Sequence, residues 1–198
     1  MIKFKNINDE KPYLIFVKKY NEALKAGQKH IEAMAISSYN KQNMEVDSRF
    51  VNLKYINGNQ FIFFSNYDSP KSIAFESHSQ ISALFYWPSS NVQIRMRAQI
   101  NKTSTEFNQE YFRTRSIDKN ALAISSNQSE KIESYDYVIR KYNDVKDTED
   151  LETCPDYWGG FSFVPYYFEF WEGNDSRLNR REVYQIENKK WKNFIVQP

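Results

Sequence analysis

The sequence is poor in the residues on which several common kinds of functional site depend. Its 198 residues include five glycines, two histidines and a single cysteine, Cys154. The glycines are not spaced as G-x-G-x-x-G or as a Walker loop, which excludes the usual dinucleotide fingerprint and the P-loop. So few histidines and cysteines also exclude an intrachain disulfide, a zinc finger and an H-E-x-x-H metalloprotease. We therefore expect no metal site.

Long hydrophobic runs are missing as well. No uninterrupted apolar run exceeds five residues (13–17 and 83–87), far below the roughly 20 needed to span a bilayer. Residues 1–8 lack the hydrophobic region of a signal peptide. The sequence therefore predicts a cytoplasmic protein without a membrane segment.

The charge is nearly balanced, with 27 Lys and Arg against 25 Asp and Glu, a formal net charge of +2. Hydrophobic residues make up 40% and aromatic residues 17%, as expected for one folded domain with a proper core. A nucleic-acid binder whose aromatic rings stack on bases is one hypothesis, but it predicts a clearly positive net charge. Any anion site must therefore be a local cluster of cations.

Periodicity and turn residues predict a chain made mainly of strands. A helix is expected over residues 9–27, and further helices over 105–115 and 130–142, the last capped by Ser129. The Asn57-Gly58 pair predicts a hairpin with a type I′ turn between strands 49–55 and 60–66. Other strands are expected at 33–38, 81–87, 92–100, 161–171, 182–186 and 191–196.

The clearest alternation lies in the expected strand 92–100. Ile94, Met96, Ala98 and Ile100 share one face, and the opposite face is polar and basic. Together these elements predict a mainly β fold with peripheral helices: a six-stranded antiparallel barrel, closed or partly closed, with an N-terminal helix and two or three further helices. We expect one domain over residues 1–198, with an N-terminal helical segment (1–28) and a C-terminal segment (147–198).

Two pairs of residues are candidates for binding an anion. Tyr111 and Arg115 are four apart on an expected helix, so both can reach one phosphate, although a surface Tyr–Arg stacking pair explains the spacing equally well. Arg49 and Lys54 are five apart on an expected strand and so point to opposite faces. They reach one ligand only across a bulge or at the end of the strand.

The residues that could act as acids or bases are few. Neither His30 nor His78 lies in a recognisable catalytic context, so we interpret both as structural. Arg177, Arg180 and Arg181 form a local excess of positive charge that a solvated turn also explains. Side chains of Lys, Arg and Tyr bind anions and orient planar rings, which suits a bound cofactor better than acid–base catalysis.

The order of several motifs resembles the pyridoxamine 5′-phosphate oxidases, also called pyridoxine 5′-phosphate oxidases, from about Pro12 to the C-terminus. The P-x-x-W-G-G and E-F-W motifs are the most specific, because both occur at the family's spacing. The similar segments are RFVNLK (49–54), FFSN (63–66), SPK (69–71), Gln93, EYFRTR (110–115), QS (128–129), PDYWGGF (155–161), FEFWEG (168–173) and RLNRR (177–181).

This resemblance implies an FMN-binding split barrel that acts as a homodimer, with the C-terminal segment in the dimer and the flavin sites between subunits. Arg49 and Lys71 would bind the FMN phosphate. The remaining cofactor contacts, some from the partner subunit, would be Phe50, Val51, Asn52, Leu53, Lys54, Phe64, Ser65, Gln93, Gln128, Ser129, Trp171 and Arg181.

The resemblance also implies the reaction, in which a vitamin B6 phosphate is oxidised at C4′ to pyridoxal 5′-phosphate, with O2 as acceptor and hydrogen peroxide as product. Lys54, Tyr111 and Arg115 would hold the substrate phosphate, with Lys119 at a position that is usually serine. Arg177, above the substrate ring, and Asn179 would be the catalytic residues.

Several departures from the family pattern leave the substrate open. Asn179 stands in place of a histidine, and Pro70 and Val92 each stand in place of an arginine. Ile195 likewise takes the place of an arginine in the closing motif. The alternative hypothesis is therefore a related FMN-binding protein whose substrate differs or whose oxidase activity is lost.

Overall fold

The computed structural model describes all residues from 1 to 198 and has a single β-sheet at its centre. Ten strands pair in the order β1-β4-β5-β8-β7-β6-β2-β3, with β9 on β8 and β10 on β9. The strands are β1 (Lys3–Lys5), β2 (Ala33–Asn40), β3 (Glu45–Asn52), β4 (Tyr55–Asn57), β5 (Gln60–Asn66), β6 (Gln80–Trp87), β7 (Val92–Lys102), β8 (Trp158–Glu172), β9 (Arg180–Glu187) and β10 (Lys190–Val196).

The predicted fold class is confirmed: a mainly β protein with peripheral helices. The run β5-β8-β7-β6-β2-β3 contains six strands, each antiparallel to its neighbours, as expected for the barrel. The sheet is larger than predicted because β1 and β4 extend one side of this run and β9 and β10 branch from β8. A strand also lies within the segment 1–28, which was expected to be helical.

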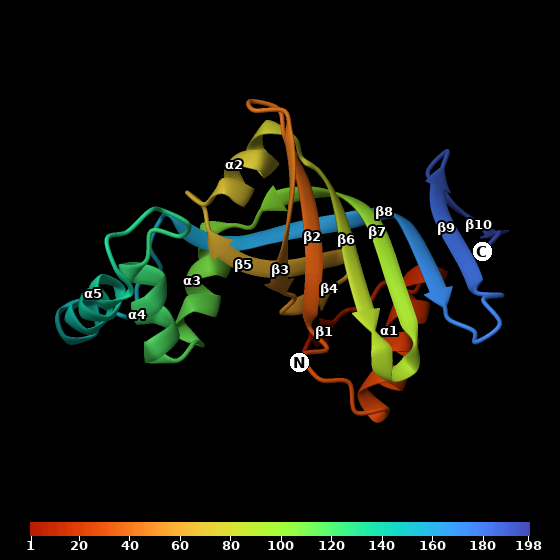
Figure 1. The fold of residues 1–198 in the computed structure, drawn as a ribbon, viewed down its shortest axis with the longest axis horizontal. Helices are drawn as coiled ribbons and strands as arrows, with labels where there is room; N and C mark the ends of the chain where they lie inside the picture. Colours follow the sequence, from red (N-terminus) through yellow and green to blue (C-terminus); the bar gives the residue numbers. More distant parts are fainter.

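Five α-helices and one short 3-10 helix lie around the sheet. They are α1 (Lys11–Lys25), α2 (Pro70–Ser77), α3 (Thr105–Arg113), α4 (Ile117–Ser125), α5 (Tyr135–Thr148) and η1 (Pro88–Ser90). Figure 1 shows β8 running across the molecule, with α3, α4 and α5 beyond one end and the β9–β10 hairpin at the other. No helix is long and apolar enough to cross a membrane.

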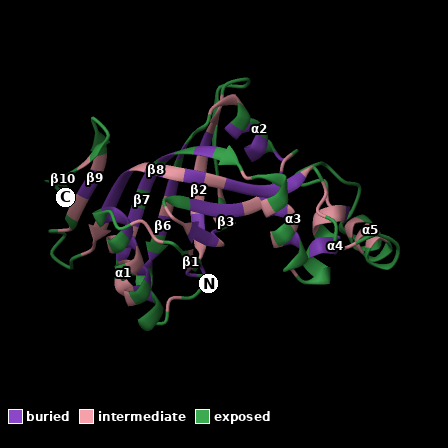
Figure 2. Ribbon diagram, turned by 180° about the vertical axis from the view of Figure 1, so that it is seen from behind, coloured by how far each residue is buried: buried purple, intermediate pink, exposed green.

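The core is formed by the central strands and the helix packed against them, and it is dominated by aromatic rings. Phe61, Phe63, Phe161 and Phe163 are buried on the paired strands β5 and β8, and Phe16 of α1 packs edge-on against Phe61. Buried positions therefore follow the central strands, whereas α5 has none (Figure 2). The alternation predicted for β7 is confirmed, because its apolar face is buried and its polar face is not.

The predicted hairpin between strands 49–55 and 60–66 is largely wrong. β3 ends at Asn52 and pairs with β2, and only the short β4 pairs with β5. Residues 53–54 join β3 to β4, which lie near opposite ends of the strand order, and Leu53 is buried within this crossing. Gly58 and Asn59 form the turn, and only Gly58 has a positive φ, the pattern of type II′ rather than type I′.

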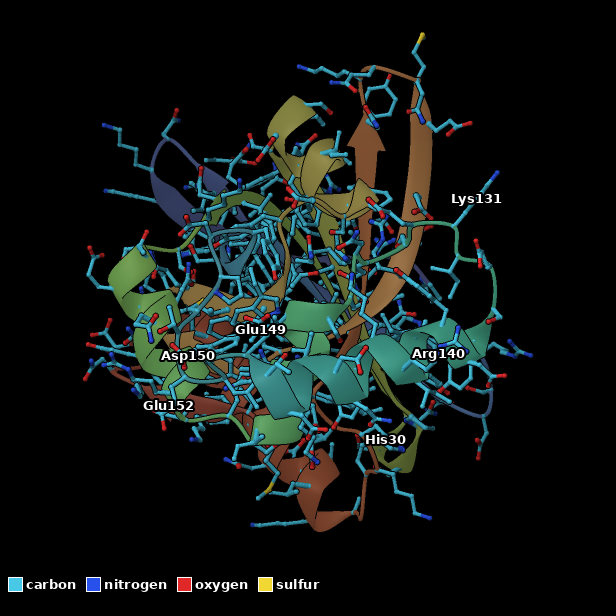
Figure 3. The ribbon with its side chains drawn as sticks, turned by 90° about the vertical axis from the view of Figure 1, so that its left-hand side faces the viewer. His30, Lys131, Arg140, Glu149, Asp150 and Glu152 are labelled. Carbon is cyan, nitrogen blue, oxygen red and sulfur yellow. The ribbon has the colours of Figure 1, made fainter.

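The helix predicted over 130–142 begins and ends later. α5 begins after Ser134, whose Oγ accepts a hydrogen bond from the backbone N–H of Tyr137, and it reaches Thr148, so the cap is not Ser129. Ser129 instead has a φ of 76° in the preceding loop. Figure 3 looks onto this end of the molecule, with Arg140 on α5 and Glu149 just after the helix. Helix α4, which packs against α5, was not predicted.

Candidate active site

A cleft of about 490 Å³ opens beside the end of β3, between β4, β5 and the helices α3 and α4. It gathers residues that are distant in the sequence. Among the predicted site residues, those that line it are Phe50, Val51, Asn52, Lys54, Phe64, Ser65, Lys71, Tyr111, Arg115, Lys119 and Gln128. Six further residues line it that the sequence did not single out: Met1, Lys3, Tyr55, Thr114, Ser116 and Trp158.

Only one of these additional residues had a detectable signal in the sequence. Trp158 belongs to the W-G-G motif, although no role was assigned to it. Met1 and Lys3 reach the cleft because β1 pairs in parallel with β4, with Lys3 opposite Tyr55. A three-residue strand has too little periodicity to be recognised from sequence.

Lys71 lies at the inner end of the cleft as a buried cation. Its Nζ donates hydrogen bonds to Ser65 Oγ (2.8 Å), Ser69 Oγ (2.9 Å) and Gln128 Oε1 (2.9 Å). Burial, together with the nearby charge of Arg49, lowers the pKa of Lys71 to about 8. A buried ammonium group with only neutral hydrogen-bond partners is a suitable site for an anionic group.

Arg49 lies next to this site but does not line the cleft. Its Nη1 donates to Ser38 Oγ at 2.8 Å, and its Nη2 contacts Asp47 Oδ2 at 2.5 Å. It lines a neighbouring hollow of about 410 Å³ together with Pro70. Arg49 and Lys54 therefore do not share a strand, contrary to the prediction, because β3 ends at Asn52, between them.

Tyr111 and Arg115 both line the cleft, but they do not stack on each other. The Tyr111 ring stacks on Phe64 with centroids 3.6 Å apart, and the Arg115 guanidinium lies over Trp158 at 4.2 Å. Arg115 Nη2 donates to the carbonyl of Lys119 at 2.8 Å, whereas its buried Nη1 has no hydrogen-bond partner. The guanidinium thus lies over an aromatic ring and has donor capacity left over for an anion.

Two lysines accompany Arg115 in this part of the cleft. Burial lowers the pKa of Lys54, and the charges of Lys119 and Arg115 lower it further against the opposing effect of Glu32. Like charges destabilise one another unless an anion lies among them. The cleft thus has a second cluster of cations, formed by Lys54, Arg115 and Lys119, in addition to Lys71.

The two glycines of the W-G-G motif allow α3 to approach the sheet. A Cβ on Gly159 would lie 2.3 Å from Asn108 Nδ2, and one on Gly160 would lie 2.4 Å from Thr103 Oγ1. Asn108 Oδ1 accepts a hydrogen bond from the backbone N–H of Gly160 at 2.8 Å. This close contact sets the position of α3, and with it that of Tyr111.

The other predicted site residues lie outside the cleft of this chain. Gln93, Trp171 and Arg181 are neighbours on β7, β8 and β9, and Arg177 and Asn179 precede β9, at the far end of the sheet in Figure 1. Asn179 Oδ1 accepts a hydrogen bond from the backbone N–H of Asn174 at 3.0 Å and so supports its own loop.

Glu169 holds one member of this group, Arg181, in place. Its carboxylate is 1% exposed and accepts hydrogen bonds from Arg181 Nε (2.8 Å), the Tyr167 hydroxyl (2.9 Å) and Arg95 Nη2. Burial by itself raises the pKa of Glu169, but these hydrogen bonds outweigh it and the pKa is lowered. Glu169 therefore stays ionised and holds Arg181 in place.

Two predicted cofactor residues occupy other surroundings. Leu53 is fully buried in the core, because it carries the chain between β3 and β4, and it does not line the cleft. Ser129 lines a separate hollow of about 450 Å³ beside α5, where Lys131 also lies. No group of three or more metal-ligating side chains is present.

Comparisons with known proteins agree with this fold. Residues 20–149 match the family model described as pyridoxamine 5′-phosphate oxidase, and residues 158–198 match the pyridoxine 5′-phosphate oxidase C-terminal dimerisation region, which supports self-association. The chain is similar to solved structures of PhzG from Burkholderia lata 383 (TM-score 0.89, 22% identity, 95% and 93% of the two chains covered) and of a pyridoxamine 5′-phosphate oxidase-related, FMN binding protein from Nostoc punctiforme (TM-score 0.79, 11% identity, 96% and 99% covered).

Relatives at higher identity share one name. A pyridoxine/pyridoxamine 5′-phosphate oxidase of Coxiella burnetii is 32% identical over 180 residues, which cover 90% of this chain and 91% of that protein. Pyridoxine/pyridoxamine 5′-phosphate oxidase 1 of Hydrogenovibrio crunogenus is 37% identical over 164 residues, covering 82% and 76%. The chain therefore belongs to the pyridoxamine 5′-phosphate oxidase family.

Proposed function

We propose that this protein is an FMN-dependent oxidase that converts pyridoxamine 5′-phosphate or pyridoxine 5′-phosphate to pyridoxal 5′-phosphate. The single observation that carries this proposal is the presence of two cation clusters in one region, each suited to one phosphate. Lys71 and Arg49 form the first, and Lys54, Arg115 and Lys119 form the second. Two phosphorylated molecules side by side are what such an oxidase must hold.

The first cluster fits the FMN phosphate. Lys71 is a buried cation whose partners are all neutral, so a dianion would supply its missing counter-charge. Phe64 and Ser65, together with residues 50–54, would line the flavin ring. Bound FMN would supply the redox chemistry, in which C4′ of the substrate loses a hydride and O2 is reduced to hydrogen peroxide.

The second cluster fits the substrate phosphate. Arg115 offers its unpartnered Nη1, while Lys54 and Lys119 add charge and Tyr111 adds a hydroxyl donor. These side chains position the substrate and need not exchange protons with it. Their contribution to rate is therefore to fix the orientation of the reacting carbon.

We further propose a homodimer in which the partner subunit completes each site. Within one chain, Arg177, Asn179 and Arg181 lie at the opposite end of the sheet from the cleft. Phe50, at the cleft, is 77% exposed, which is unusual for a phenylalanine in a finished site. A second copy would cover it and contribute the catalytic Arg177. We also propose that residues 1–198 form one domain, in which the segment 147–198 makes the dimer contacts. The cytoplasmic location stays a prediction.

An oxidase assay tests this function. The FMN-loaded protein is expected to form pyridoxal 5′-phosphate and hydrogen peroxide in equal amounts from pyridoxamine 5′-phosphate. Unphosphorylated pyridoxamine should be a poor substrate, because it lacks the group that the second cluster binds. Full FMN occupancy without turnover of either phosphorylated substrate would favour the alternative, a flavoprotein that acts on something else, to which Asn179 and Lys119 point.

The pH dependence of FMN binding tests the role of Lys71. Its pKa of about 8 means that the free protein loses this charge as the pH rises above 8. Bound phosphate stabilises the protonated form, so affinity for FMN should be constant between pH 7 and 7.5 and then fall by up to about tenfold per pH unit above 8. Quenching of flavin fluorescence between pH 7 and 9.5 measures this.

Lys71→Arg is the matched control, because arginine keeps its charge throughout this range. Its affinity for FMN should change much less with pH. Parallel curves for the two proteins would show that another group titrates.

A further inference from the structure

The guanidinium of Arg49 is held from two sides within its own sheet. Ser38 on β2 accepts from Nη1 at 2.8 Å, with the Ile36 carbonyl oxygen 3.4 Å from the same nitrogen. On the other side, Asp47, two residues earlier on β3 and so on the same face, contacts Nη2 at 2.5 Å. The Arg49 side chain is 17% exposed and that of Asp47 is 70% exposed.

Asp47 therefore changes the charge that a phosphate would meet. The hydrogen bond from Arg49 is the main reason why the pKa of Asp47 is lowered, so this carboxylate is ionised at neutral pH. The negative charge of Asp47 also acts on Lys71 and raises the pKa of that lysine, against the larger effect of burial, which lowers it. With Asp47 in place, Arg49 and Lys71 together supply a net charge of about one rather than two.

Within this chain, no further cation lines the hollow around Arg49. The hollow around Arg49 is lined by Ser38, Asn40, Asn43, Glu45, Val46, Asp47, Pro70 and Ala74, so it contains two carboxylates and one cation. Pro70 is the residue adjacent to Lys71 at the start of α2 and offers neither charge nor a backbone N–H.

We propose that Asp47 is an internal competitor for the cofactor phosphate: its carboxylate occupies one hydrogen-bonding edge of Arg49 and lowers both the affinity for FMN and the preference for FMN over riboflavin. This inference rests on the proposed function, in which Arg49 and Lys71 bind that phosphate. The phosphate must draw the guanidinium away from Asp47 or bind beside a like charge, and either event weakens binding.

In the opposite role, Asp47 would position Arg49 for the phosphate. Loss of its charge would then not strengthen the binding of FMN. Asn retains an oxygen that can accept the hydrogen bond from Nη2, while Ser38 holds Nη1 in either protein. Asp47→Asn therefore removes the charge and leaves the geometry. A competitor predicts tighter binding of FMN in this variant, and a positioning residue predicts unchanged or weaker binding.

The experiment compares the dissociation constants of FMN and riboflavin for the cofactor-free protein. In Asp47→Asn the FMN constant should fall about fivefold at low salt, as expected for removal of one exposed charge near a dianion, and the gain should shrink at high salt. The riboflavin constant should not change, because riboflavin has no phosphate. Glu45→Gln is the matched control: it makes the same charge change on the same strand, but Glu45 bonds Asn43 rather than Arg49.

Two outcomes would overturn the inference, and they are distinguishable. If Asp47→Asn leaves FMN binding unchanged or weaker while removal of Arg49 and Lys71 still abolishes it, the phosphate site is correct and Asp47 is not a competitor. If removal of Arg49 and Lys71 leaves FMN binding intact, the proposed phosphate site itself is wrong and the inference fails with it. An equal gain in Glu45→Gln would also overturn it, because the effect would then be one of general charge.

Discussion

The double variant Arg49→Ala/Lys71→Ala is expected to lose FMN. Each side chain can make a charge-assisted hydrogen bond to the phosphate, worth about 1.5–3 kcal/mol, so the pair should account for about a 10³-fold loss of affinity. Lys71 carries the larger share, since it is buried and its partners are neutral. The purified variant should be colourless, and titration with FMN should give the dissociation constant directly.

The matched control removes two cations of the second cluster. Arg115→Ala/Lys119→Ala makes the same change in net charge, and it should keep FMN while the KM for the phosphorylated substrate rises. Riboflavin binding should change little in either variant. Normal flavin occupancy in Arg49→Ala/Lys71→Ala would show that the phosphate is bound elsewhere.

Glu169→Ala is expected to destabilise the protein by about 3 kcal/mol. The substitution leaves Arg95 and Arg181 without their shared carboxylate and the Tyr167 hydroxyl without its acceptor. Breaking a buried ion pair from one side costs about 3–5 kcal/mol, and the partial exposure of both arginines places this one at the lower end. Thermal unfolding should show a fall in Tm of about 10 °C.

Glu172→Ala on the same strand is the control for this prediction. Glu172 is 40% exposed and pairs with Lys19 at 3.0 Å, so its loss should cost less than about 1 kcal/mol. Equal losses of stability in the two variants would show that the buried ion pairs of Glu169 stabilise the protein no more than the exposed pair of Glu172 does. Glu169→Gln should lie between them, because the amide keeps one acceptor oxygen.

The sequence predicted which strand faces are buried better than it predicted how the strands are connected and paired. The alternation in β7 correctly assigned its two faces, and the Asn57-Gly58 pair correctly marked a turn. The register was not predictable in the same way: residues 49–55 read as one strand, yet β3 ends at Asn52 and the buried Leu53 leads into β4, near the other end of the strand order. That crossing depends on packing between segments far apart in the sequence.

The candidate site shows the same division. The motifs identified Lys54, Tyr111, Arg115 and Lys71, which the fold brings to one cleft. The helix that Ser129 was predicted to cap begins instead after Ser134, and the loop before it places Gln128 Oε1 as an acceptor for Lys71 Nζ. That contact joins residues 57 positions apart, so no local pattern predicts it.

The sequence by itself indicated the family, the predominance of strands and most of the cationic side chains of the candidate site. Motif order and periodicity carry this information, and both can be read along the chain without knowledge of its folding. Only the tertiary structure decided that Lys71 is buried among neutral oxygens, that Asp47 contacts Arg49, and that Arg177 and Arg181 lie across the sheet from the cleft. Those facts depend on which strands pair. They also depend on the balance, for each side chain, between the solvation it loses on burial and the contacts it gains.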